Sequence, residues 1–538
     1  MKIPKTTTFL LLFLVTAVMA SAQTDLNRYL PENASAIISF NSNRLHSKMT
    51  WEEFTQSKLF SKISEKSSPE FRKVIAQPDS LGLDKNPEVL LAIVNDEKNP
   101  GEGYASLLVR MKNTAQFNRA ATKLFKNRLP KTVGSSKLLT DKDMVYGWNK
   151  DLLVITVTGK NKQAQQSPTA KATTLPSANR MKLLSEQTLK LLTPRINNPV
   201  LKDPRYTGLM KEEADVRMWS VGNFNPIRDL LGKNTGAMAP NTLKGGVKAA
   251  LINFENGAVT WQTKNYLAKP VDSLYRLYPG TKINTELAGH LPKGQVLLYI
   301  TLNYPAELVK GLLEVSGFGD MIKGAFSRTP MNGQDYSGLF KGDFGLAIVK
   351  ADEIADEDSL SQKLGGMQLF LTGSIADKSK FEKMVQSFRS KSDSSAGGGG
   401  KAAAFLGGLK QGLQYNDRIF VLSLSPQAAS KFLNNPATGT PDWLQPYASE
   451  ASFVNFDLQS IFSLLMRSKK GSEGDAKAQE VIRSLDRIIS YGGSYSDGHL
   501  NNRVEIRFSD KDQNSLRQLV NLAAAAAESG MRPKSAGE

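Results

Sequence analysis

The densest group of side chains that could bind a metal is a run of five carboxylates. Calcium takes about six to eight oxygen ligands, and closely spaced carboxylates can supply several of them. The spacing of the run differs from that of an EF-hand loop, so a solvated acidic turn is the favoured interpretation and calcium binding is the alternative. The five residues are Asp352, Glu353, Asp356, Glu357 and Asp358.

Cysteine and histidine, the side chains that most often bind zinc or act as nucleophile and base, are absent or scarce. The chain has no cysteine, which excludes disulfides, thiol nucleophiles and thiolate metal sites. Its three histidines, His46, His290 and His499, lie far apart, so a zinc site or a His-based triad would need distant segments to converge. His290 precedes a Leu-Pro pair just as Tyr29 does, which favours a structural role. We therefore predict no catalytic, cofactor-binding or metal-ligating residue.

The sequence also lacks the short motifs of common enzyme classes, with neither a G-x-S-x-G elbow nor a G-x-x-x-x-G-K-[ST] phosphate loop. Two tyrosines, Tyr275 and Tyr278, could stack on sugar rings, but packing of one part of the chain on another is the commoner use of such rings. A hydrolase whose carboxylate pair converges from distant loops stays open as an alternative, because spacing along the chain does not test it.

The elements that would position any site are written twice. Residues 29–41 (YLPENASAIISFN) recur as residues 290–303 (HLPKGQVLLYITLN), each with Leu-Pro, a short polar turn and an apolar β-rich run that ends on Asn. Later segments recur in the same order, including a helix whose apolar face repeats with helical spacing. That face is formed by Phe117, Ala120, Ala121 and Leu124 in the first occurrence and by Phe381, Met384, Val385 and Phe388 in the second.

This recurrence predicts an α+β fold of two tandem homologous modules, each a mostly antiparallel sheet with helices on one face. The expected order in a module is β-α-β-β-α-β-β followed by β-α-β-β. The predicted segments are a signal peptide at residues 1–22, a first module at 23–268, a connector at 269–290, a second module at 291–528 with a flexible Gly-rich insertion at 390–410, and a disordered tail at 529–538.

The first residues have the pattern of a signal peptide. Lys2 and Lys5 precede an apolar run at residues 9–20, which is shorter than the roughly 20 residues that a membrane-spanning helix needs. Small residues follow, so cleavage is predicted after Ala22, with export to the periplasm or the cell exterior. We expect no transmembrane segment in the mature chain and, without cysteine, no lipid anchor.

The chain is strongly basic. Removing Lys2 and Lys5, the two charged residues among the first 22, lowers the formal net charge from +18 to +16. Such a charge favours contact with anionic surfaces, for example envelope polysaccharide. Because the lysines and arginines are spread along the chain, a basic solvated surface is the favoured interpretation and polyanion binding is an alternative. Nucleic acid is not expected as a partner.

The exported start, the Leu-Pro opening and its recurrence at mid-chain resemble an uncharacterised family of Bacteroidota cell-envelope proteins, the domain of unknown function 4836. The resemblance implies an envelope location and this architecture, and it brings no activity, cofactor or site residue. The leading hypothesis is a non-enzymatic protein that binds or scaffolds in the cell envelope. The alternatives are an envelope-polymer hydrolase with a carboxylate pair and a polyanion (polysaccharide) binder.

Overall fold

The structure is a computed structural model that describes most of the chain between residues 25 and 528. The predicted signal peptide at residues 1–22, the acidic run at 352–358, most of the Gly-rich insertion and the predicted tail at 529–538 lie outside the described residues. The described ranges are 25–65, 81–84, 88–95, 103–125, 128–141, 143–158, 177–195, 197–221, 245–315, 338–351, 366–392, 412–435, 437–467 and 482–528.

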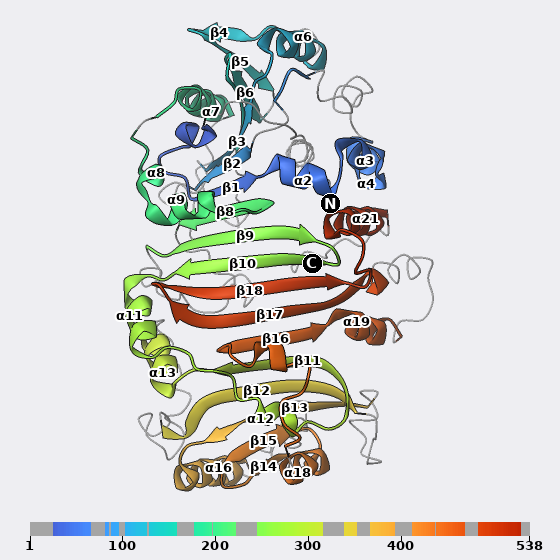
Figure 1. The fold of residues 1–538 in the computed structure, drawn as a ribbon. Coiled ribbons are helices and arrows are strands. Elements are labelled where there is room, and N and C mark those ends of the chain that lie inside the picture. The colour runs from blue at the N-terminus through green and yellow to red at the C-terminus, as the bar shows by residue number, and fades with distance from the viewer. Residues whose placement is uncertain are drawn as a thin grey trace.

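The described strands form one sheet in which every pairing is antiparallel (Figure 1). Their bounds are β1 Ala36–Phe40, β2 Val89–Val94, β3 Tyr104–Arg110, β4 Lys131–Val133, β5 Ser136–Asp141, β6 Met144–Trp148, β7 Leu152–Thr158, β8 Val216–Val221, β9 Val247–Glu255, β10 Ala258–Tyr266, β11 Gly294–Asn303, β12 Phe340–Ala351, β13 Met367–Ile375, β14 Leu413–Tyr415, β15 Ile419–Ser423, β16 Ser452–Asp457, β17 Leu485–Ser496 and β18 His499–Phe508.

The helices lie around the sheet (Figure 1). Their bounds are η1 Leu26–Tyr29, α2 Ser42–Lys48, α3 Trp51–Gln56, α4 Lys58–Ser64, α6 Thr114–Leu124, α7 Ser177–Leu191, α8 Pro199–Lys202, α9 Pro204–Lys211, α11 Lys269–Leu277, α12 Glu286–Gly289, α13 Ala306–Val315, α16 Lys378–Ser392, α18 Pro426–Asn434, η6 Gln445–Tyr447, α19 Leu458–Arg467 and α21 Ser515–Glu528. Within the described ranges, no helix combines the length and the apolar character that crossing a lipid bilayer requires.

The sheet is continuous from β4 at one end to β14 at the other, with β10 and β18 side by side at its centre (Figure 1). Outward from β10, the pairing order is β9, β8, β1, β2, β3, β7, β6, β5 and β4. Outward from β18, it is β17, β16, β11, β12, β13, β15 and β14. We call β1 to β10 the first half and β11 to β18 the second half. Each strand of the second half thus has a counterpart at the same step and in the same chain order, and β4 and β5 extend the first half.

The cores lie on both faces of the sheet, so the prediction of helices on one face is wrong. Neighbouring residues of a strand point to opposite faces. Leu90 packs in the core under η1 and α7 to α9, whereas Leu91 packs in the core under α6. The second half repeats this division, with Val421 facing α12 and α18 and Phe420 facing α16. Strands that are apolar on both faces need cover on both, which their continuous apolar runs indicated.

A helix follows the last strand of each half and packs against the other half. After β10, α11 lies beside α13 of the second half, where Leu274 approaches Gly311 (Figure 1). After β18, α21 lies beside α3 and α4 of the first half (Figure 1), where Val520 joins an apolar cluster with Phe54 and Phe60. The two halves are therefore joined by the central strand pair and by this exchange of helices.

Candidate functional site

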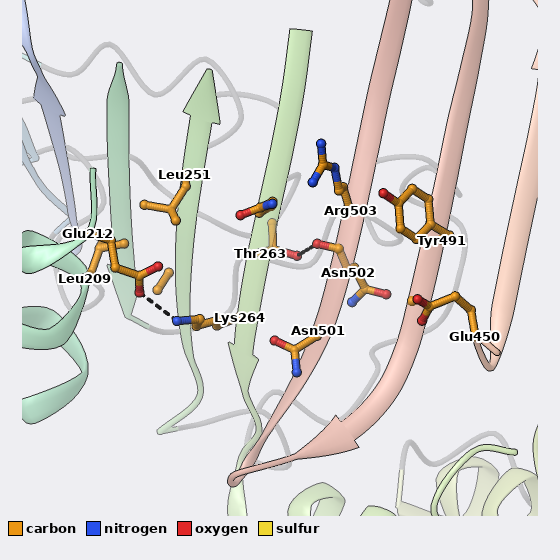
Figure 2. Close-up of a pocket in the computed structure, with 13 residues that line it drawn as sticks. Leu209, Glu212, Leu251, Thr263, Lys264, Glu450, Tyr491, Asn501, Asn502 and Arg503 are labelled. Carbon is orange, nitrogen blue, oxygen red and sulfur yellow. Dashed lines mark hydrogen bonds and ion pairs between the residues drawn. The ribbon is translucent and has the colours of Figure 1, made fainter. Parts of the chain in front are cut away.

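A pocket of about 280 Å³ lies on the centre of the sheet, where the first and second halves meet (Figure 2). Its floor crosses β9, β10, β18 and β17, and its walls come from the end of α9 and from the segment before β16. We call it the central pocket. Its lining residues are Leu209, Glu212, Ala249, Leu251, Gln262, Thr263, Lys264, Glu450, Tyr491, Gly492, Asn501, Asn502 and Arg503.

Strand register brings polar side chains from both halves to the floor of the central pocket. Gln262 on β10 pairs with Arg503 on β18, and directly paired residues project to the same face. The next strands outward add Leu251 beside Gln262 and Tyr491 beside Arg503. The β9–β10 hairpin that sets this register turns at Gly257, whose φ of +68° suits glycine and where a Cβ atom would lie 2.7 Å from backbone.

The charges that line the central pocket are balanced. Glu212 accepts a hydrogen bond from the Lys264 ammonium at 2.6 Å, as Figure 2 shows. On the opposite side, Glu450 has no ion-pair or side-chain hydrogen-bond partner among the described residues, and burial raises the pKa of its carboxyl. With Arg503 on the floor, two carboxylates face two cations, so the pocket carries no surplus of either charge.

A buried carboxylate holds the floor in place from β18. Glu505 accepts hydrogen bonds from Arg507, at 2.7 Å from Nη2 and 3.1 Å from Nε, and from the Tyr491 hydroxyl at 3.2 Å. Its other oxygen-to-nitrogen contact is with Arg503 Nε at 3.2 Å. Burial and the nearby Glu505 raise the pKa of Tyr491 to about 12, so its hydroxyl stays a neutral donor. The network leaves the terminal nitrogens of Arg503 without a partner among the described residues.

The three histidines singled out from the sequence are not among the residues that line the central pocket. His290 is buried, contacts the Asn435 carbonyl through Nδ1 at 2.7 Å and packs on Phe432. His499, the first residue of β18, is also buried and contacts the Asp497 carbonyl at 3.2 Å. His46 lies on α2. These contacts agree with the structural role predicted for His290. No three His, Asp or Glu residues of the described ranges are grouped so that they could hold a metal ion.

The connector tyrosine Tyr275, on α11, packs against two tyrosine rings of the second half. Its ring lies 6.2 Å from that of Tyr304 and 6.1 Å from that of Tyr495, and burial raises its pKa to about 12. These contacts correspond to the packing interpretation of the connector rather than to a sugar-stacking one. The acidic run with its calcium alternative lies outside the described residues.

None of the central pocket's residues was predicted from the sequence. They come together through the pairing of β10 with β18, two strands about half the chain apart, and no local pattern encodes that pairing. One signal was present. Each closing hairpin carries polar residues at alternate positions of its second strand, Gln262 and Lys264 in one and Arg503 and Glu505 in the other. A strand with such alternation has one polar face. Two such strands at equivalent places in the two closing hairpins indicate a candidate binding surface.

Comparison with known proteins gives a family and no activity. Comparison with curated protein sequences found no match. Among solved structures, crystal form I of TP0453 matches with a TM-score of 0.26 and 11% identity, over 46% of this chain and 80% of that one. Crystal form IV gives 0.25 and 10%, over 47% and 84%. Similarity at this level supports no conclusion about fold or function. A family model matches residues 27–352, more than half of the chain, and the protein therefore belongs to the family described as domain of unknown function (DUF4836).

Proposed function

We propose that the protein is an exported, non-enzymatic binding protein of the cell envelope, which holds a polar ligand in the central pocket between two homologous halves. The observation that carries the proposal is the position of the pocket. It lies where the halves join, and both contribute polar side chains to it. Ligand sites are commonly concave and lie at such junctions.

Equivalent hydrogen bonds support the homology of the halves. Asn149 Oδ1 accepts from the backbone N–H groups of the second and third residues after it, at 2.8 and 2.9 Å. Asn416 Oδ1 makes the same two contacts, both at 2.9 Å, in the corresponding turn before β15. Asn41 and Asn303 end the two copies of the opening stretch. The N–H group of each donates at 2.8 Å to a backbone carbonyl just before the neighbouring strand, that of Asp215 before β8 and that of Ala451 before β16. Such repetition of contacts and strand order favours duplication of one ancestral module.

The same correspondence supports an approximate twofold axis at the central pocket. Gln262 comes five residues after Gly257 and Arg503 five residues after Gly498, the glycines that turn the two closing hairpins. The two residues are therefore equivalent, and they pair with each other. An axis that relates the halves would pass between them. The floor of the pocket would then be made by one strand position used twice, with different side chains.

Binding is favoured over hydrolysis because one of the two carboxylates in the central pocket, that of Glu212, is already held in an ion pair. Glycoside hydrolysis needs two carboxyl groups on either side of one bond. In the central pocket, Glu212 is held by Lys264, and Glu450 lies on the opposite side (Figure 2). The raised pKa of Glu450 is what a general acid needs, so hydrolysis keeps a specific observation in its favour. Loss of turnover of an envelope polymer in Glu450→Gln would establish it.

A pocket-filling substitution tests the proposal without knowledge of the ligand. The experiment measures the melting temperature of the purified protein with and without a concentrated extract of the native envelope. A ligand at 100 times its Kd adds about 2.7 kcal/mol to the free energy of unfolding. We expect the extract to raise the melting temperature of wild-type protein and of Gln56→Trp, which carries the same change on α3, and to leave Gln262→Trp unchanged. An equal rise in all three would refute binding at the central pocket.

Export is tested separately from binding. The mass of the protein recovered from its native cells should correspond to a chain that begins at Gln23, and the protein should fractionate with the envelope. Recovery of the uncleaved chain from the cytoplasm would refute export.

A further inference from the structure

We infer that the ligand of the central pocket is a short, uncharged oligosaccharide. The inference depends on the proposed function, because it assigns a chemical class to the ligand of the same pocket. Four properties of the pocket lead to it: its charge balance, its free hydrogen-bonding groups, its apolar surface and a floor without a free strand edge.

The charge balance disfavours a polyanion, even though the chain as a whole is basic. A site for a charged polymer would offer an excess of cations, since each anionic group needs a counter-charge. Lys264 is already paired with Glu212, and the remaining cation, Arg503, contacts Glu505 through Nε at 3.2 Å, so Glu450 keeps no ion-pair partner among the described residues. An anionic sugar unit would therefore lie near an unpaired carboxylate, which costs free energy.

The free polar groups of the pocket include both donors and acceptors. Among the described residues, the exposed Gln262 amide, the Glu450 carboxylate and the terminal nitrogens of Arg503 have no partner. Asn501 donates to Ser496 at 3.0 Å and keeps its amide oxygen free to accept. A hydroxyl both donates and accepts, so neighbouring hydroxyl groups can satisfy amide, carboxylate and guanidinium partners together. A polyhydroxylated ligand fits this set.

Apolar surface lies next to these polar groups. Leu209, Ala249 and Leu251 line one side, and the Tyr491 ring lines the other (Figure 2). Tyr491 is fixed by contact with the ring of Tyr447, at 4.8 Å between centroids. Sugar rings carry hydroxyl groups around an edge and C–H groups on a face. Alternating apolar and polar surface therefore matches a sugar better than it matches a wholly polar solute.

The floor argues against an extended peptide. Peptides that bind to sheets gain affinity from main-chain hydrogen bonds to an unpaired strand edge. In the central pocket, β10 lies between β9 and β18, and β18 lies between β10 and β17 with a register shift between Gly492 and Ser494, so the floor offers no free strand edge. A peptide could use side-chain contacts alone.

The dimensions set the length of the ligand. Four neighbouring strands span roughly 14 Å between the outer two, at about 4.8 Å per step. The volume of about 280 Å³ is near the lower limit of about 300 Å³ for ligand pockets. The pocket therefore takes a few sugar units, as a free oligosaccharide or as part of a longer neutral chain.

Isothermal titration calorimetry of the full mature chain tests the inference. The probes are neutral tetrasaccharides (malto-, cello-, xylo- and mannotetraose), an oligogalacturonate tetramer as the anionic counterpart, and capped uncharged tetrapeptides. The variants are Gln262→Ala and Glu450→Ala, each of which removes a hydrogen-bonding group, with Gln56→Ala as the control that removes an exposed amide on α3. We expect a neutral tetrasaccharide to bind wild-type protein and the control alike. Each pocket variant should bind it about 2- to 10-fold more weakly, the effect of losing one hydrogen bond.

The other outcomes separate the inference from the function on which it depends. If the anionic tetramer or a peptide binds and the pocket variants weaken that binding, the glycan assignment is wrong and binding at the central pocket stands. If a neutral tetrasaccharide binds all variants equally, the assignment of that sugar to this pocket is wrong. If no neutral tetrasaccharide binds, the inference is overturned, and the melting experiment with Gln262→Trp decides the proposed function independently.

Discussion

Gln262 and Arg503 face each other across the β10–β18 ladder, each at the same distance from the glycine that turns its hairpin. The helices that cover this face of the sheet leave the pair open. The first-half core lies under α7 to α9, and the second-half core lies under α12 and α18. The centre between these two covers is the floor of the central pocket. An arrangement of this kind lets two similar halves build one site with an unlike pair of side chains.

Equivalent turns should respond in a related way to equivalent substitutions. Asn149→Ala and Asn416→Ala each remove two hydrogen bonds to backbone N–H groups. We expect each to lower the free energy of unfolding by about 1–3 kcal/mol. Asn149 also donates to the Leu192 carbonyl at 3.0 Å, so its substitution should cost about 1 kcal/mol more. Urea denaturation measures both, and two variants indistinguishable from wild type would contradict the equivalence.

A buried ion cluster occurs at one of two matching positions. Asp215 is fully buried and accepts hydrogen bonds from Arg44 Nε at 3.0 Å, from the Lys48 ammonium and from the Phe254 N–H at 2.6 Å. Ala451 takes its place in the second half. Asp215→Ala should lower the free energy of unfolding by about 3–5 kcal/mol, because it leaves Lys48 without its ion pair and Arg44 with only the exposed Glu213.

The reverse substitution, Ala451→Asp, should also destabilise the protein, because it buries a carboxylate at a position that is 1% exposed. Asp442→Ala, at an exposed position, serves as the control for both. Thermal unfolding measures the melting temperatures of the three variants. A melting temperature of Asp215→Ala equal to that of the Asp442→Ala control would refute this account.

The exchanged helix α21 should be held by apolar contact rather than by its ion pair. Val520 is 8% exposed and packs with Phe54 and Phe60, so Val520→Ala should cost about 1–3 kcal/mol. Arg517 contacts Glu53 at 2.9 Å, but both side chains are about two-fifths exposed, so Arg517→Ala should cost less than about 1 kcal/mol. Urea denaturation distinguishes them. A larger loss for Arg517→Ala would show that charge, not packing, holds the helix.

The raised pKa of Glu450 predicts that the stability of the protein changes with pH. Burial raises the pKa of its carboxyl in the folded protein above the ordinary value of 4.5. Between the two pKa values the folded state binds more protons than the unfolded state. The contribution of Glu450 to the free energy of unfolding therefore falls as the pH rises through that interval.

Replacing the carboxyl removes this dependence. Glu450→Gln should gain melting temperature relative to wild type as the pH is raised from about 4 to about 7. Glu186→Gln, at an exposed position of α7, is the matched control. Parallel curves for wild type and Glu450→Gln would contradict a raised pKa for this partly buried carboxyl.

Local patterns predicted most of the individual elements. The helix capped by Asn113 is α6, with Phe117, Ala120 and Ala121 buried, and the Asp377-capped helix is α16. Runs such as β2 and β3 lie where apolar continuity placed them. The prediction missed β4, whose three residues are all exposed, and β5, and neither strand contains a long apolar run. It also missed the short helices α8, α9, α12 and α18. Their stability comes from contacts with the sheet rather than from their own sequence.

The joining of the halves into one sheet could not be read from the sequence. A pairing such as Gln262 with Arg503 depends on contacts between segments whose separation the local pattern does not record. The central pocket follows from that pairing, which is why the sequence indicated no site residue. The domain boundaries at residues 268 and 291 and the Bacteroidota affiliation stay predictions.

The most direct test of the central claim is a crystal structure of the mature protein with the tightest-binding compound from the titrations. We predict density for the compound over the paired Gln262 and Arg503, with contacts from Glu450 in the second half and from Lys264 or Leu251 in the first. A compound bound elsewhere on the molecule, with the central pocket empty, would contradict the claim that the two halves share one binding site.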